Sequence, residues 1–159
     1  MDAGEKFMTK KITSDQIRKL KEMTGAPVMR VKKVLEELGG DEKKAEEILR
    51  KEGFEKAAKR VGRETKAGIL TSYTHHTQKI VGLVELFCET DFVARNELFQ
   101  KLGQDLAMQV ASMGETDIEK QDFIKDPSKK VADLIKEVIA KTGENVKLGR
   151  TIRLELGKE

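Results

Sequence analysis

An acidic and a large aromatic side chain stand side by side at Asp91-Phe92, between segments of different periodicity. Residues 80–87 form a short apolar run rich in β-branched and aromatic residues, which is typical of a buried strand. After Asn96, apolar residues recur every three or four positions, as on one helix face. Asp91 and Phe92 are therefore predicted at a strand-to-helix turn. There a carboxylate can attract backbone N–H groups of another molecule, and a free ring can enter an apolar crevice.

The residues alone leave two interpretations of this turn open. In the first, Thr90 or Asp91 caps the following helix and Phe92 fills the local core. In the second, Phe92 is presented to a partner. Both hold together if the cap makes the turn rigid, because a rigid turn places its side chains more sharply.

Patterns for catalysis or cofactor binding are not found in the sequence. It contains neither a Gly-x-Ser-x-Gly motif nor a phosphate-binding glycine loop followed by Lys-Ser/Thr. His75 and His76 are adjacent in a strand or turn, so we expect their side chains to point to opposite faces, unlike the convergent ligands of a metal. Cys88 ends an apolar strand and is expected to be a small buried hydrophobe. We therefore expect neither an enzyme nor a bound cofactor or metal.

Three short helices are predicted in the first third of the chain. Thr13 begins a capping box, Gly25 and Pro27 separate the first two helices, and Gly53 ends the third. Each helix has an apolar stripe but is too short to be stable alone. We predict an N-terminal extension or cloning remnant at residues 1–8, a three-helix domain at residues 9–55 and a linker at residues 56–67 that is helical at first, through Ala57 and Ala58.

Residues 68–159 predict a second, α+β domain. Ile69–His75 and Ile80–Phe87 have strand composition and flank a polar turn, which indicates a β-hairpin. We expect a long helix from Val93 to Met113 and another that begins at Pro127-Ser128 and ends at Gly143. The alternation in residues 146–156 indicates a half-exposed strand. The fold class is α+β, with three helices first and then a three-stranded antiparallel sheet with helices packed on one face.

The composition limits the kind of partner. Charged residues make up 37% of the chain and aromatics 4%, with no apolar run long enough to span a membrane and no leader pattern. We expect a cytoplasmic protein. Basic residues outnumber acidic ones up to Lys66, so an alternative function is a basic helical module that binds nucleic acid or nascent chains. Interleaved acids and scarce aromatics argue against direct contact with nucleic acid.

Three segments, in this order, resemble bacterial elongation factor Ts: Thr24–Leu35, Glu89–Arg95 and Lys141–Val146. The resemblance covers nearly all of the chain after Met8. It implies a guanine-nucleotide exchange factor for elongation factor Tu in translation elongation, which binds that partner in its GDP-bound and nucleotide-free forms. It also implies that the first three helices form a domain of the ubiquitin-associated type.

The resemblance further implies roles for individual residues. The segment Thr90, Asp91, Phe92 and Val93 would dislocate Mg²⁺ in elongation factor Tu, with the ring entering between helices of its G domain. A second contact from the N-terminal module would involve Lys21, Val28, Met29 and Lys32, where Val28 departs from the Met of some relatives. His75 and His76 are candidate contacts to the same partner.

The length of the chain leaves room for one core subdomain, whereas longer members of the family have two and a coiled-coil insertion. We therefore expect a homodimer, built on the face or the edge of the core sheet. The alternating segment Thr151–Leu156 is the candidate contact, because an unpaired edge readily accepts another strand.

Overall fold

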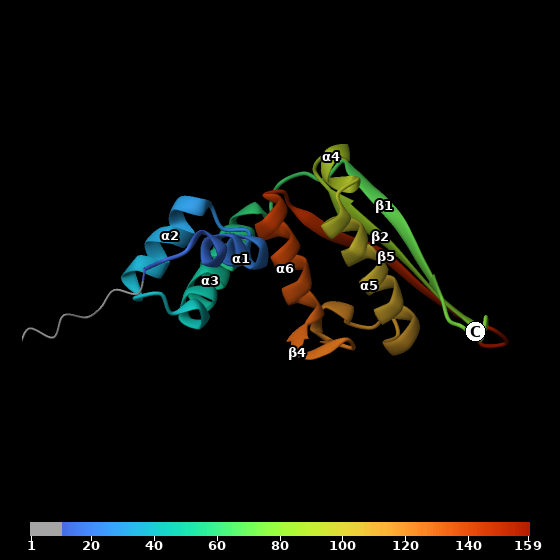
Figure 1. The fold of residues 1–159 in the computed structure, drawn as a ribbon. Coiled ribbons are helices and arrows are strands. Elements are labelled where there is room, and N and C mark those ends of the chain that lie inside the picture. Colours follow the sequence, from blue (N-terminus) through green and yellow to red (C-terminus); the bar gives the residue numbers. More distant parts are fainter. Residues whose placement is uncertain (1–10) are drawn as a thin grey trace, which may run out of the picture. The chain divides into compact units, whose positions relative to one another are not determined.

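A computed structural model of the chain describes residues 11–159 (Figure 1). The chain divides into two compact units, Met1–Glu55 and Lys56–Glu159. The predicted N-terminal extension, residues 1–8, lies outside the described residues, as do residues 9 and 10 of the predicted helical domain. Among the described helices, none combines the length and the apolar character that a membrane span requires.

The first unit is built from helices α1 (Ser14–Thr24) and α2 (Val28–Glu37) and most of α3 (Glu42–Arg60). The predicted capping box is present: the Thr13 hydroxyl accepts the Gln16 N–H at 3.2 Å, and the Gln16 side-chain oxygen accepts the Thr13 N–H at 3.0 Å. The buried core of the unit consists of Leu20, Val31, Val34, Leu35, Ala45 and Leu49.

Helix α3 does not end at Gly53, and this part of the sequence prediction is wrong. The helix continues to Arg60 through five residues of the predicted linker. A glycine inside a helix costs only about 1 kcal/mol. Ala57 lies beyond it and is 1% exposed in the core of the second unit, so tertiary packing outweighs the local stop signal.

The second unit contains the predicted three-stranded antiparallel sheet, in the order β1 (Ala67–Thr74), β2 (Ile80–Cys88), β5 (Val146–Glu155). Helices α5 (Glu97–Met113) and α6 (Val131–Thr142) lie on the same side of this sheet (Figure 1). The α+β prediction is thereby confirmed. Helix α5 comes so close to β2 that a Cβ atom added at Gly82 would lie 2.2 Å from the Ala107 carbonyl oxygen.

The helix predicted to begin at Pro127-Ser128 begins at Val131 instead. Residues Asp126–Lys130 form strand β4, which pairs with the two-residue strand β3 (Asp122–Phe123). A residue that precedes proline is driven to extended conformations, and the Asp126 carboxylate accepts both the N–H and the hydroxyl of Ser128. These local bonds favour a turn over a helix start. The irregular segment before β3 contains one short 3-10 helix, η1 (Ile118–Lys120).

The single helix predicted from Val93 to Met113 is two helices in the structure. A one-turn helix α4 (Asp91–Ala94) is followed by a break at Arg95-Asn96 and then by α5. Asn96 is extended, and its side-chain oxygen accepts the Leu98 N–H at 2.8 Å, so it is the N-cap of α5. Because of this break, the residues that follow β2 form a separate one-turn helix, α4.

Candidate functional site

The segment Thr90–Val93, the tip, forms the cap and first turn of α4 at the end of β2. Thr90 is extended and its hydroxyl accepts the Val93 N–H at 3.3 Å. Its carbonyl oxygen accepts the Ala94 N–H at 3.1 Å. The first of the two interpretations is thus correct for Thr90, which is the helix cap.

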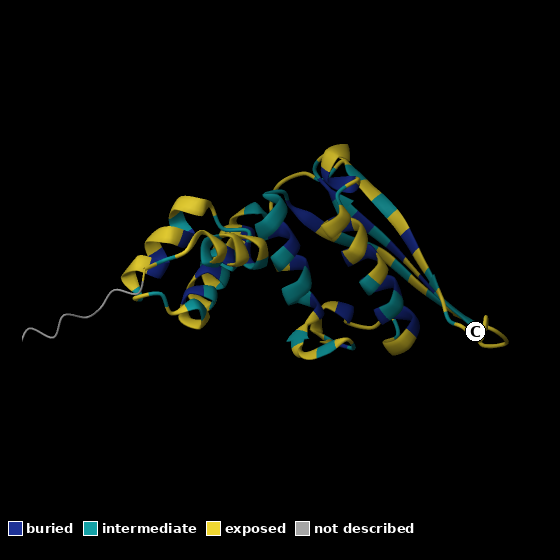
Figure 2. Ribbon diagram, viewed as in Figure 1, coloured by how far each residue is buried: buried dark blue, intermediate teal, exposed yellow. Residues whose placement is uncertain are grey.

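The ring of Phe92 does not fill the local core, because its side chain is 82% exposed. Asp91 is also exposed, and Figure 2 shows exposed residues on the outer part of the α4 turn. Val93 and Ala94, in contrast, are 3% and 6% exposed and belong to the core cluster. The four predicted residues therefore divide: Asp91 and Phe92 face outward, Thr90 caps, and Val93 anchors the turn and has no free side-chain surface.

Cys88 lies beneath the tip as a buried thiol, as predicted. Its Sγ donates to the Thr90 carbonyl oxygen at 3.2 Å. Burial, with a contribution from the negative charge of Glu144, raises the pKa of the Cys88 thiol to about 11. The thiol therefore stays protonated near neutral pH and supports the tip as a hydrogen-bond donor.

The residues that brace the tip come from far along the chain and are not among the predicted site residues. The loop after α6 brings Glu144 and Asn145 beside it. Asn145 is 3% exposed, and its backbone N–H donates to the Glu89 carboxylate at 2.8 Å. The signal for them in the sequence is the resemblance of Lys141–Val146 to a family motif, but the motif alone assigns no contact.

The predicted residues of the N-terminal module lie on α1 and α2. At the first turn of α2, Val28 is 44% and Met29 75% exposed, and Lys32 follows one turn later on the same side of the helix. Lys21 is exposed in the last turn of α1. Two neighbouring apolar side chains thus stand free beside a lysine on one helix.

The prediction that His75 and His76 point to opposite faces is wrong, because both follow the end of β1 and lie in the hairpin turn. Their ring centroids are 4.1 Å apart. The whole length of β2, about 26 Å at 3.3 Å per residue, separates this turn from the tip. The structure does not bring the two histidines together with Thr90–Val93. Within residues 11–159 no group of three or more His, Cys, Asp or Glu side chains is placed to hold a metal ion.

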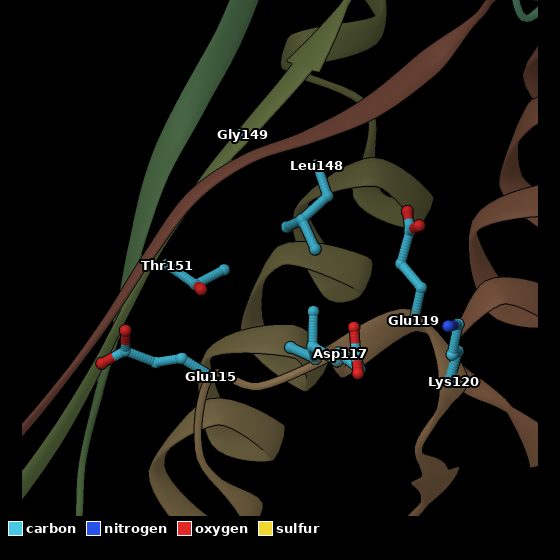
Figure 3. Close-up of a pocket in the computed structure, with 8 residues that line it drawn as sticks. Glu115, Asp117, Glu119, Lys120, Leu148, Gly149 and Thr151 are labelled. Atoms are coloured by element: carbon cyan, nitrogen blue, oxygen red, sulfur yellow. The ribbon is translucent and has the colours of Figure 1, made fainter.

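A separate pocket of about 340 Å³ lies between the loop after α5 and strand β5 (Figure 3). Its lining includes three acidic side chains, Glu115, Asp117 and Glu119. The Glu115 carboxylate already accepts the backbone N–H of Arg153. The pocket extends along β5 to Leu148, which is the register partner of Leu86 near the end of β2.

Comparison with known proteins decides the family. The family model described as "Elongation factor TS" matches residues 89–159, which contain the whole tip and both α5 and α6. The elongation factor Ts of Thermotoga petrophila is 39% identical over 193 residues, which cover 92% of this chain and 97% of that protein. This chain belongs to the elongation factor Ts family.

Two further elongation factor Ts proteins extend the comparison. That of Thermotoga neapolitana is 40% identical over 194 residues, covering 93% of this chain and 98% of the relative. That of Aquifex aeolicus is 43% identical over 152 residues, covering 91% of this chain and 52% of the relative. The alignment with the Thermotoga petrophila protein spans 193 positions although this chain has 159 residues, so that elongation factor Ts contains residues without a counterpart here.

As an elongation factor Ts, the chain is a nucleotide exchange factor for elongation factor Tu in translation elongation. Exchange factors make and break no covalent bond, so the protein is not an enzyme. The family assignment replaces the alternative of a basic helical module for nucleic acid or nascent chains.

Proposed function

We propose that this elongation factor Ts releases GDP by using the tip to disturb the Mg²⁺ and phosphate site of elongation factor Tu. The observation that carries the proposal is Phe92, an 82% exposed ring on a turn whose next residue, Val93, is 3% exposed. A free aromatic ring on an anchored base can enter a partner without first being pulled out of its own core. Burying such a ring stabilises a complex by about 2–3 kcal/mol.

The Mg²⁺ and phosphate site of elongation factor Tu tolerates little displacement of its ligands. Bound GDP is held by Mg²⁺, by backbone N–H groups and by a lysine at the phosphates. Mg²⁺ requires near-ideal octahedral geometry, so a small shift of its ligands weakens the nucleotide. Asp91 adds a carboxylate that attracts backbone N–H groups of the partner loop. By linkage, GDP then weakens the binding of the factor by the same ratio.

The helical domain supplies a second contact in this proposal. Val28 and Met29 offer apolar surface to a partner helix, and Lys21 and Lys32 offer charge. The division of labour follows the two proposed domains, residues 9–55 for holding the partner and residues 68–159 for exchange, with residues 56–67 between them. A role in translation assigns the protein to the cytoplasm.

The direct test is the release of labelled GDP from elongation factor Tu with and without this chain, repeated over a range of free Mg²⁺. We expect the rate of GDP release to rise with the concentration of this chain. The acceleration should become smaller as the concentration of free Mg²⁺ rises, because added Mg²⁺ opposes the loss of the ion from its site. Acceleration that does not depend on Mg²⁺ would contradict the proposed mechanism while leaving the exchange function intact.

We also propose that two copies of the chain pair through the outer face of the sheet. This face carries exposed apolar side chains on all three strands and just beyond: Leu70, Leu83, Ile152, Leu154 and Leu156 are 80%, 40%, 50%, 63% and 72% exposed. Leu83 is the register partner of Ile152, so the patch is continuous across β2 and β5. An apolar patch of this kind on a lone domain favours association.

A charged pair lies beside this patch on the same strands. The Glu85 carboxylate accepts hydrogen bonds from the Arg150 side chain at 2.9 and 3.0 Å and from its backbone N–H at 2.9 Å. These bonds lower the pKa of Glu85 to about 2, so the pair stays ionised and internally satisfied at neutral pH. It can therefore lie at the rim of a contact without needing a partner from the second copy.

Light scattering should give about twice the 17.9 kDa mass of the chain for the wild type. We expect the double variant Leu83→Asp, Ile152→Asp to be monomeric, because it puts facing carboxylates into the patch. The control Val61→Asp changes a 66% exposed side chain outside the sheet and should stay dimeric. A wild type that is monomeric at assay concentrations would overturn the proposal.

A further inference from the structure

The carboxylate of Glu144 holds the cap residue of the tip with both of its oxygens. Oε1 accepts the Thr90 backbone N–H at 3.0 Å, and Oε2 accepts the Thr90 hydroxyl at 2.7 Å. The two residues are 54 positions apart in the sequence. The contact thus joins the loop after α6 to the start of α4.

This double contact sets the direction of the hydrogen bonds at the tip. The Thr90 hydroxyl has one proton, and donating it to Glu144 leaves its lone pairs for the Val93 N–H. A bond to a charged acceptor is stronger than a neutral one and polarises the next bond in the chain. Glu144 therefore fixes the hydroxyl in the orientation that caps α4.

The remaining polar atoms of Thr90 are also occupied, since its carbonyl oxygen accepts the Ala94 N–H and the Cys88 thiol. Every polar atom of Thr90 is therefore already hydrogen-bonded within the domain. Thr90 is thus the fixed first residue of the turn, and the position of Phe92, two residues later, depends on it.

Glu144 is itself held in place from both sides. On one side its backbone N–H donates to the Thr142 hydroxyl at 3.4 Å. On the other side, Asn145 donates from its side-chain amide to the carbonyl oxygens of Val61 and Arg63, at 3.2 and 2.8 Å. These bonds fix the backbone on both sides of the Glu144 side chain, so the carboxylate reaches Thr90 from an anchored loop.

We propose that Glu144 is a positioning residue for nucleotide exchange: by holding Thr90 it keeps the ring of Phe92 where it must enter the partner. This inference rests on the proposed function of the tip. The contact lies at the surface, so its loss removes little buried apolar area and leaves the fold intact. Misplacing a group that must fit a partner site, in contrast, is costly in rate even for small displacements.

The test compares Glu144→Ala with the matched control Glu97→Ala, which removes a carboxylate of the same charge from the exposed start of α5. GDP release from elongation factor Tu is measured against factor concentration, together with melting temperature and amide hydrogen exchange at Val93 and Ala94. For Glu144→Ala we expect the maximal release rate to fall about tenfold. The half-saturating concentration and melting temperature should change little, and both amides should exchange faster. Glu97→Ala should match the wild type.

Glu144→Gln is a second, conservative variant for the same assay, because its amide oxygen can still accept the Thr90 N–H. We expect it to recover part of the rate, and it serves as the test if Glu144→Ala does not fold. Unchanged release by both variants, or an equal loss in Glu97→Ala, would overturn the positioning role. Phe92→Ala in the same assay separates the two proposals: if it slows release while Glu144→Ala does not, only the positioning role fails. If neither slows release, the proposed function of the tip fails.

Discussion

Alanine in place of Phe92 is expected to slow GDP release from elongation factor Tu about 30-fold and to leave the melting temperature nearly unchanged. The rate effect follows from the loss of about 2 kcal/mol of ring burial in the partner, at 1.36 kcal/mol per factor of ten. The stability effect is small because the side chain is 82% exposed, and substitutions at such sites change the free energy of unfolding by about 0.5 kcal/mol or less.

Stopped-flow measurement of labelled GDP release, paired with thermal melts, checks this expectation. Leu98→Ala is the matched control, because it truncates a 41% exposed apolar side chain on the neighbouring helix. It should leave release unchanged. A Phe92→Ala variant with a much lower melting temperature and normal release would instead support the interpretation of Phe92 as a core residue.

The same substitution seven residues later should have the opposite effect. Phe99 is 0% exposed and is the largest fully buried side chain of the core under the sheet. Phe99→Ala removes its packing and leaves a cavity, which costs about 3–5 kcal/mol in the free energy of unfolding. For a domain of this size we expect the melting temperature to fall by about 15 °C or more.

Calorimetry or circular dichroism measures the fall in melting temperature. A GDP-release assay at low temperature measures the exchange activity of the protein that is still folded. We expect the folded fraction of Phe99→Ala to release GDP at close to the wild-type rate, because the tip lies on another turn. A Phe99→Ala variant that melts with the wild type would show that α5 is not essential to the core.

The features predicted well from the sequence are those with local causes. The strand of residues 80–87 and the capping box at Thr13 depend on neighbouring residues, and the structure contains both. The break before α5 also has a local cause, the cap residue Asn96, but the apolar stripe that continues across it predicts a single longer helix.

The β3–β4 hairpin was missed because its cause lies elsewhere in the chain. Gln109 of α5 is 0% exposed, and its side-chain amide donates to the Asp122 carbonyl oxygen at 3.0 Å. Its amide oxygen accepts the Ile124 N–H at 3.0 Å. A buried glutamine on helix α5 thus satisfies the backbone of the hairpin, and the local bonds at Asp126 and Ser128 explain only why no helix begins there. The bond between Glu144 and Thr90 escaped prediction for the same reason.

At Gly82 of β2, the backbone of the strand lies directly against the backbone of α5. A methyl group there would collide with Ala107 and with the backbone nitrogen of Ala111, both in the second half of α5. The missing side chain at this one strand position therefore lets α5 lie directly against β2, and any larger residue there would force the helix and the strand apart.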